Sequence, residues 1–274
     1  MAPSRIKHLD SLPPLPYVAH EILLAVNDGD ESITKIAAAL AREPGLTARL
    51  VAMANSAFCG NQRPVYSPEE AVVRLGLNRV RVLAASVLLA KQFDSARCPA
   101  FRAERYWFDA VGTAFCAARV ARPAGLAHAE DAAYLAGLLH NIGLLLLVYV
   151  FPDEMNRVLE THGAAPDESL VALTRKALGT EHHEAGRLLL AEWGLPEEIV
   201  DAAGHVPGQQ NRGPHRSLIA LVEFCSRWTA ATFDTLPPIP AELTLDVSRL
   251  DPIAEACRRE SEQLQAFARL LATA

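Results

Sequence analysis

The sequence predicts an all-α protein that is built from short helices. Hydrophobic residues recur at spacings of three and four along most of the chain, which is the pattern of a helix with one buried face. Segments with the alternating pattern of a β-strand are almost absent, and no Asn-Gly pair marks a hairpin. Proline, glycine or aspartate repeatedly interrupts the helical pattern, so each helix is expected to be short.

The chain divides into three segments. The region at 91–107 is polar and has no periodic pattern at its centre, which indicates a boundary near residue 98. We predict one helical bundle at residues 1–97 and a second at 98–233. A proline-rich connection and a C-terminal helix are predicted at 234–274.

An apolar stretch at 132–151 approaches the ~20 residues that a membrane-spanning helix needs. His140 and Asn141 lie in the middle of this stretch, and acidic residues precede it. Because polar side chains are costly in lipid, we predict one continuous helix that is apolar on all sides and buried at the centre of a bundle. Gly137 and Gly143 flank His140 and are expected to leave room beside its ring.

The C-terminal helix is predicted to begin with Asp251 as its cap and proline in the first turn. Its apolar residues then step by four and three, with a glutamate in the seam: Ile253, Cys257, Glu260, Leu264, Phe267 and Leu271. Because this pattern is too short for a stable coiled coil, docking on the body is favoured over dimerisation. The oligomeric state stays open.

Composition excludes several classes of function. The formal net charge is −6 and no long basic run exists, so we expect no nucleic-acid partner; Arg74, Arg79 and Arg81 form at most a local contact. The five cysteines are odd in number and widely spaced, which fits a reduced compartment better than a disulfide framework. The N-terminus lacks the apolar core of a signal peptide, so we expect a cytoplasmic protein without a membrane partner.

Four histidines are candidates for chemistry. His140 lies on the predicted buried helix, where a ring nitrogen needs a hydrogen bond or a metal. Asn141 follows it and offers a neutral oxygen, which binds a dication only weakly. His182 and His183 fall in the first turn of a helix, where His182 is nearer the buried face and His183 projects aside. His205 lies in a loop rich in Gly and Pro and is expected to be exposed. An ordinary structural role is the alternative for each.

Asn55 and Ser56 end a predicted helix and form another candidate site. Asparagine tolerates the left-handed conformation, so a C-cap near Gly60 would explain the pair. Alternatively, the amide and the hydroxyl tie two lobes together or contact a partner. Trp193, at the end of the helix that begins near His182, is grouped with them as a lobe-interface or partner contact.

Several segments resemble the HDOD family, a group of bacterial signalling modules related to the HD phosphohydrolases. The resemblance is carried, in order, by "LPPLP", "MANSAFCG", "VRLGLNRVRV", "GLLHNIG" and "EWGLP", and it spans about 11–232. It implies an all-helical protein of two lobes, with an HDOD-type bundle first and an HD-like helical lobe after it. Members of the family generally act without chemistry of their own.

The related HD enzymes hold metal ions with histidines and a bridging aspartate, and only part of that set is present. Their first histidine, on an earlier helix, is missing, and their His-Asp pair is replaced by His140-Asn141. A late helical aspartate is also missing, since that region offers Glu223 and Ser226. The resemblance thus implies no catalytic residue, no cofactor and no metal. The residual ligand candidates are His140, Asn141, His182 and His205.

We therefore expect a non-catalytic module that binds another signalling protein in trans, such as a kinase, a response regulator or a cyclic-nucleotide enzyme. A nucleotide that is bound without being cleaved is a further option. The alternative is a residual metal-dependent phosphohydrolase that acts on a nucleotide or a cyclic dinucleotide, with Glu184 or Glu223 in place of the lost aspartate.

Overall fold

The computed structural model describes residues 44–55, 63–165 and 167–273, together with the separate positions 13–15, 17, 19, 22 and 38. Every regular element within these residues is a helix, which confirms the all-α prediction. The elements are α3 (Pro44–Ala54), α4 (Pro68–Leu75), α5 (Leu77–Gln92), α6 (Ala103–Ala121), η3 (Ala127–Ala129), α7 (Glu130–Leu139), α8 (Ile142–Val150), α9 (Pro152–Ala164), α10 (Leu170–Leu178), α11 (His182–Glu192), α12 (Glu197–Gly204), α13 (Arg216–Ala230), η4 (Val247–Arg249) and α14 (Asp251–Ala272).

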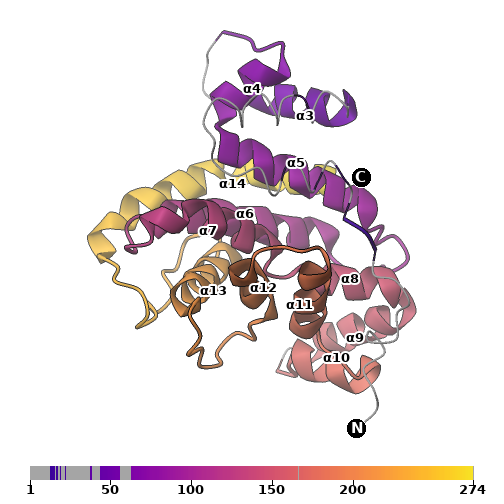
Figure 1. The fold of residues 1–274 in the computed structure, drawn as a ribbon. Coiled ribbons are helices and arrows are strands. Elements are labelled where there is room, and N and C mark those ends of the chain that lie inside the picture. The colour runs from indigo at the N-terminus through magenta and orange to yellow at the C-terminus, as the bar shows by residue number, and fades with distance from the viewer. Residues whose placement is uncertain are drawn as a thin grey trace.

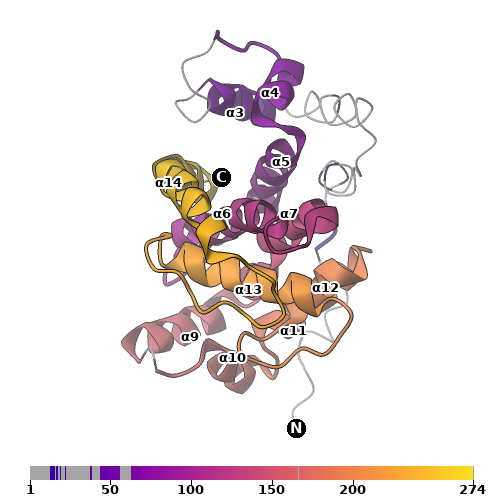
Figure 2. The same ribbon diagram turned by 90° about the vertical axis from the view of Figure 1, so that its left-hand side faces the viewer.

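Helix α6 is the central element of the molecule. It packs against α7, α13 and α14, and most of its residues are buried. Figures 1 and 2 show α5 above α6, with α3 and α4 beyond it at the top, whereas α8 to α13 lie below. The described helices thus form a small upper part and a larger lower part. The residue limits of the three predicted segments stay predictions.

The apolar stretch in the middle of the chain forms two helices, so the prediction of one continuous helix is wrong. α7 ends at Leu139, α8 begins at Ile142, and His140 and Asn141 form the turn between them. Within the described residues, Ala127–Val150 alone has the length and hydropathy of a membrane span, but 72% of its most apolar window is buried inside the protein. Neighbouring helices therefore supply the apolar surroundings of this stretch.

Gly137 and Gly143 bring helices into backbone contact, which corrects the expectation that they leave room beside His140. A Cβ atom at Gly137 would lie 2.7 Å from the Cα atom of Ala114 on α6. A Cβ atom at Gly143 would overlap the carbonyl oxygen of His182 on α11. Only a residue without a side chain permits these approaches, and the second one fixes the first turn of α11 beside the turn at His140.

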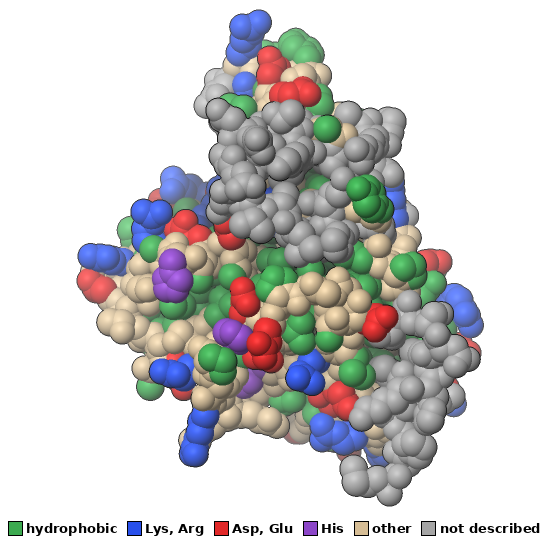
Figure 3. Space-filling view, viewed as in Figure 1, with side chains coloured by type: hydrophobic (Ala, Val, Ile, Leu, Met, Phe, Trp, Pro, Cys, Tyr) green, Lys and Arg blue, Asp and Glu red, His purple; other side chains and the backbone are tan. Residues whose placement is uncertain are grey.

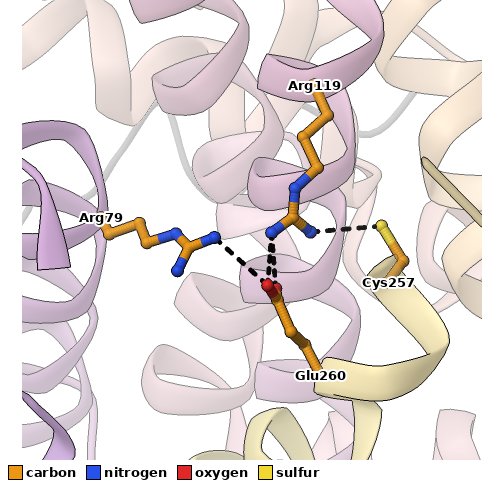
Figure 4. A network of polar contacts seen from close by, with 4 residues as sticks. All are labelled: Arg79, Arg119, Cys257 and Glu260. Atoms are coloured by element: carbon orange, nitrogen blue, oxygen red, sulfur yellow. Dashed lines mark hydrogen bonds and ion pairs between the residues drawn. The ribbon is translucent and has the colours of Figure 1, made fainter. Parts of the chain in front are cut away.

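Helix α14 docks along α6, as its sequence pattern predicted. The glutamate in its seam is balanced by two arginines, as Figure 4 shows: Arg119 Nη2 donates to Glu260 Oε1 and Oε2 at 2.6 and 2.7 Å, and Arg79 Nη2 donates to Oε1 at 3.2 Å. The predicted cap is wrong. Leu250 is the N-cap and Asp251 is already the first helical residue.

The three arginines of the predicted basic cluster make contacts within the protein. Arg79 pairs with Glu260, while Arg74 and Arg81 donate to backbone carbonyls at 3.3 and 3.2 Å. On the face that Figure 3 presents, acidic and basic side chains are interspersed without a patch of one sign. The four described cysteines are buried and free.

Candidate functional site

Four histidines gather where three helix ends meet. His140 follows the last residue of α7, His182 and His183 begin α11, and His205 follows α12. α11 packs against α8 and α12, and this packing brings the ends together. The rings are electrostatically coupled: His140 with His182 and His183, and His183 with His205. We call these residues, with Asn141, the histidine cluster.

His140 is held by two hydrogen bonds. Its Nδ1 atom lies 2.8 Å from the carbonyl oxygen of Gly137, and its Nε2 atom lies 3.3 Å from the hydroxyl oxygen of Ser226 on α13. Because a carbonyl only accepts, Nδ1 carries the proton and Nε2 presents a lone pair. Burial lowers the pKa of His140 to about 4, with a smaller contribution from His183. The ring is therefore neutral at pH 7.

Asn141 takes the place of the aspartate that follows the histidine in the related HD enzymes, and its amide carries no charge. It is the N-cap of α8, but its side chain makes no capping hydrogen bond. Its Oδ1 atom is buried and has no hydrogen-bond partner among the described residues. A buried acceptor in that state costs about 1–3 kcal/mol, so local stability does not explain why the residue is an asparagine.

His182 and His183 are equally buried, each with 7% of its surface exposed. The prediction that His183 projects aside is wrong, because α12 packs against α11 in addition to α8. The two rings lie against each other with their centroids 4.1 Å apart and their planes tilted by 39°. Burial lowers the pKa of His182 to about 3 and that of His183 to about 4, and neighbouring histidines add to both shifts.

His205 is also inside, which corrects the prediction of an exposed loop histidine. Only 10% of its side chain is exposed, and its Nε2 atom lies 3.1 Å from Glu223 Oε2 on α13. Glu223 Oε1 also accepts from the backbone N–H of Gly208 at 3.0 Å and from Arg227. Glu223 therefore organises the loop after α12 and is already occupied by these contacts.

A cavity of about 430 Å³ opens beside His140 and Asn141. Asp109 on α6 lines it, and this is the residue that the sequence reasoning missed. Its Oδ2 atom accepts from Arg105 Nε at 2.9 Å, whereas its Oδ1 atom is buried without a described partner. Burial raises the pKa of Asp109, and Arg105 opposes that rise. One feature of the sequence could have identified Asp109. It lies in the segment where the related HD enzymes carry their first metal-binding histidine.

The remaining candidates lie apart from the cluster. Asn55 bonds the backbone of Val65 with both ends of its amide, at 2.7 Å each, and so ties the end of α3 to the segment before α4. Ser56 lies outside the described residues. Trp193 Nε1 donates to the carbonyl oxygen of Pro13 at 2.9 Å, so it connects α11 to the N-terminal segment.

The helical body and the histidines at its helix ends define an HD-like helical protein. The chain belongs to the HDOD family, whose domain model matches residues 12–207. It is similar to a solved protein from Marinobacter aquaeolei VT8 that is named for signal transduction, with a TM-score of 0.78 and 26% identity over 95% of this chain and 60% of that one.

Two further proteins that are similar to this chain differ from each other in name and in length. A solved protein from Shewanella amazonensis SB2B, named as a phosphohydrolase, shares the fold with a TM-score of 0.76, 24% identity, and coverage of 98% of this chain and 99% of that one. An uncharacterized protein from Treponema pallidum (strain Nichols) is 26% identical over 232 residues, or 82% of this chain and 44% of that one. The chain thus spans less than two thirds of the Treponema and Marinobacter proteins.

The described residues do not fit the pair of metal ions that HD enzymes use. A bridging carboxylate is absent at Asn141, and its Oδ1 atom carries no formal charge. Glu223, which could replace the late aspartate, is held by His205, Gly208 and Arg227. Asp109 is paired with Arg105.

Proposed function

We propose that this chain is a non-catalytic signalling module that acts in the cytoplasm by binding another signalling protein in trans. The observation that carries the proposal is the turn at His140 and Asn141, which offers an imidazole and an amide but no acid. Family membership and the signal-transduction name of the Marinobacter relative support this class of function.

The turn at His140 and Asn141 lacks the charged oxygen ligand that activation of water by a metal would require. A hard dication prefers charged oxygen ligands, and a bound water loses its proton readily only when the metal is held firmly. His140, His182 and His183 are neutral at pH 7, since burial lowers the pKa of each, so they bring no negative charge to a dication. The lack of a charged ligand at this turn supports binding rather than turnover.

The proposed partner is a kinase, a response regulator or an enzyme of cyclic-nucleotide metabolism. In two relatives the matching part belongs to a longer chain, which is typical of a module that works beside other domains. The surface seen in Figure 3 mixes both signs of charge, which suits a protein partner better than a nucleic acid.

A second candidate is a residual phosphohydrolase or phosphodiesterase acting on a nucleotide or cyclic dinucleotide. One observation favours it: Asp109 brings a carboxylate into the cavity that His140 and Asn141 line. Because Arg105 holds one carboxylate oxygen, Asp109 would have to exchange this pairing for a metal before it could take part.

An activity assay separates the two candidates. The purified full chain is incubated with Mn²⁺, Fe²⁺ or Mg²⁺ and a cyclic dinucleotide, a nucleotide or a simple aryl phosphodiester. We expect no turnover above a sample with chelator. Metal-dependent turnover that Asp109→Asn abolishes would overturn the non-catalytic proposal, and Asp153→Asn on the exposed start of α9 is the matched control.

Affinity capture tests the binding half of the proposal. The full chain is immobilised, and retained proteins are identified by mass spectrometry and then purified for direct titration. We expect a signalling protein to bind in direct titration. A thermal-shift panel of nucleotides tests the ligand option, because a ligand held at 100 times its Kd stabilises by ~2.7 kcal/mol.

A further inference from the structure

The first turn of α11 gathers three metal-ligating side chains. Glu181, His182 and His183 are consecutive, and one ligand atom from each lies within 4.8 Å of the other two. All three are buried, at 3%, 7% and 7% exposure. This group shares His182 with the residual ligands of the HD-type set, but Glu181 and His183 do not belong to that set and Asn141 takes no part.

The ring nitrogens in this group are not satisfied by the protein. The Nδ1 atoms of His182 and His183 are buried without a hydrogen-bond partner among the described residues. Buried polar atoms are nearly always paired with protein or a bound species. Two unpaired nitrogens in one turn therefore point to an absent partner that accepts electron pairs from both.

The surroundings of His183 leave a ring nitrogen available for a metal. Its Nδ1 atom is buried and makes no hydrogen bond within the described residues. The backbone of Ala203, near the end of α12, lies close enough to interact with the same ring. A backbone group beside the ring is a common outer contact of a metal-bound histidine.

Glu181 supplies the negative charge. Its Oε2 and Oε1 atoms accept from the backbone N–H groups of His183 and Glu184 at 2.8 and 2.9 Å. Each carboxylate oxygen keeps a second lone pair besides these contacts. The positive end of the α11 dipole opposes a cation here, and the carboxylate offsets that repulsion.

We propose that Glu181, His182 and His183 bind a single Zn²⁺ ion. Two imidazoles and one carboxylate form a donor set that a borderline dication prefers, and they leave a fourth position for water. Zn–N bonds of ~2.0–2.1 Å place tetrahedral ligand atoms about 3.4 Å apart. The three ligand atoms lie within 4.8 Å of one another, so the side chains must draw together to complete the shell. This site goes beyond the proposed signalling function and needs no catalysis.

Calorimetric titration of the full chain tests the site. The protein is stripped with chelator, dialysed, and titrated with Zn²⁺ and, separately, with Mg²⁺. We expect one equivalent of Zn²⁺ to bind and Mg²⁺ not to bind, together with a raised Tm in Zn²⁺. Absence of Zn²⁺ binding, or binding of Mg²⁺ at a comparable affinity, overturns the proposal.

Matched variants locate the ion. Glu181→Gln keeps an oxygen for the helix cap but removes the charge, and His183→Gln removes one imidazole. Each is expected to raise the Kd for Zn²⁺ at least tenfold. His215→Gln removes a histidine that pairs with Asp201 elsewhere and is expected to leave the Kd unchanged. Binding that survives both α11 variants but is lost in His140→Gln refutes the assignment.

A measurement on the wild-type chain keeps the proposal testable if a variant fails to fold. X-ray absorption at the zinc edge is expected to show a shell of nitrogen and oxygen donors with the signature of two imidazoles. A shell with one imidazole or none, or with sulfur, contradicts the site. Circular dichroism of each metal-free variant checks that its helices remain formed.

Discussion

Two polar clusters lie in the apolar body, and they differ in how far their atoms are satisfied. At α14, Glu260 receives hydrogen bonds from Arg119 and Arg79 across three helices. In the histidine cluster, ring nitrogens and the Asn141 amide oxygen are buried without described partners. The first cluster stabilises the packing of α14. The second cluster lacks the stabilising hydrogen bonds that its buried polar atoms could make, which is typical of a position kept for binding.

The largest expected effect comes from the helix contact that positions the histidine cluster. In Gly143→Ala the new methyl group would overlap the backbone of α11, where no side chain can yield. We expect a loss of about 3 kcal/mol or more in the free energy of unfolding, measured with urea. Gly163→Ala on α9, where nothing lies within 4 Å, is the control and should be neutral or slightly stabilising. Equal effects would show that the close approach is not decisive.

The next effect tests the satisfied cluster. Glu260→Gln leaves the charge of Arg119 partly buried and unpaired, and the side chains in these contacts are only 18–25% exposed. We expect the free energy of unfolding to fall by about 2–4 kcal/mol, below the full cost of a completely buried pair. Glu255→Gln on the exposed face of α14, 4.0 Å from Arg259, should change it by less than ~0.5 kcal/mol. A comparable loss in both variants would contradict the structural role of Glu260.

The third effect is the dependence of folding stability on pH, which arises in the histidine cluster. The folded-state pKa of His140 is about 4, below the ~6.5 of an unfolded chain, so the unfolded state binds more protons between these values. Stability is therefore fully present above about pH 6.5 and is lost as the pH falls toward 4. In the metal-free protein, His140→Asn should remove about 2 kcal/mol of the loss seen between pH 7 and pH 5. An unchanged pH profile would mean that the fold does not lower the pKa of this ring.

The smallest effect provides a baseline outside both clusters. Trp193→Phe removes the hydrogen bond from Nε1 to the carbonyl oxygen of Pro13 and keeps most of the buried ring. We expect a loss of about 1 kcal/mol, the usual contribution of a single neutral hydrogen bond. Thermal unfolding measures it, and Trp107→Phe on α6 is a comparison at another buried tryptophan. A much larger loss at Trp193 would indicate that this bond holds the N-terminal segment in place.

Sequence reasoning succeeded where the signal was local and repeated. The helical spacing of Cys257, Leu264, Phe267 and Leu271 identified the face of α14 that is buried against α6. It failed at the turn of His140 and Asn141, because apolar residues continue on both sides of this pair and do not mark where one helix stops. It also failed for His183 and His205, whose burial depends on α12 and α13, which lie elsewhere in the chain.

The sequence by itself determined the helical class and the family of this protein. It also showed that the residue after His140 carries no charge, because periodicity and residue chemistry are properties of the chain alone. Only the tertiary structure decided which polar atoms find partners. It turned Glu260 into a satisfied contact, brought Asp109 to the cavity beside His140, and left the Nδ1 atoms of His182 and His183 without a hydrogen-bond partner among the described residues. The physical reason is that hydrogen bonding and burial depend on the approach of helices distant in sequence, which spacing does not encode.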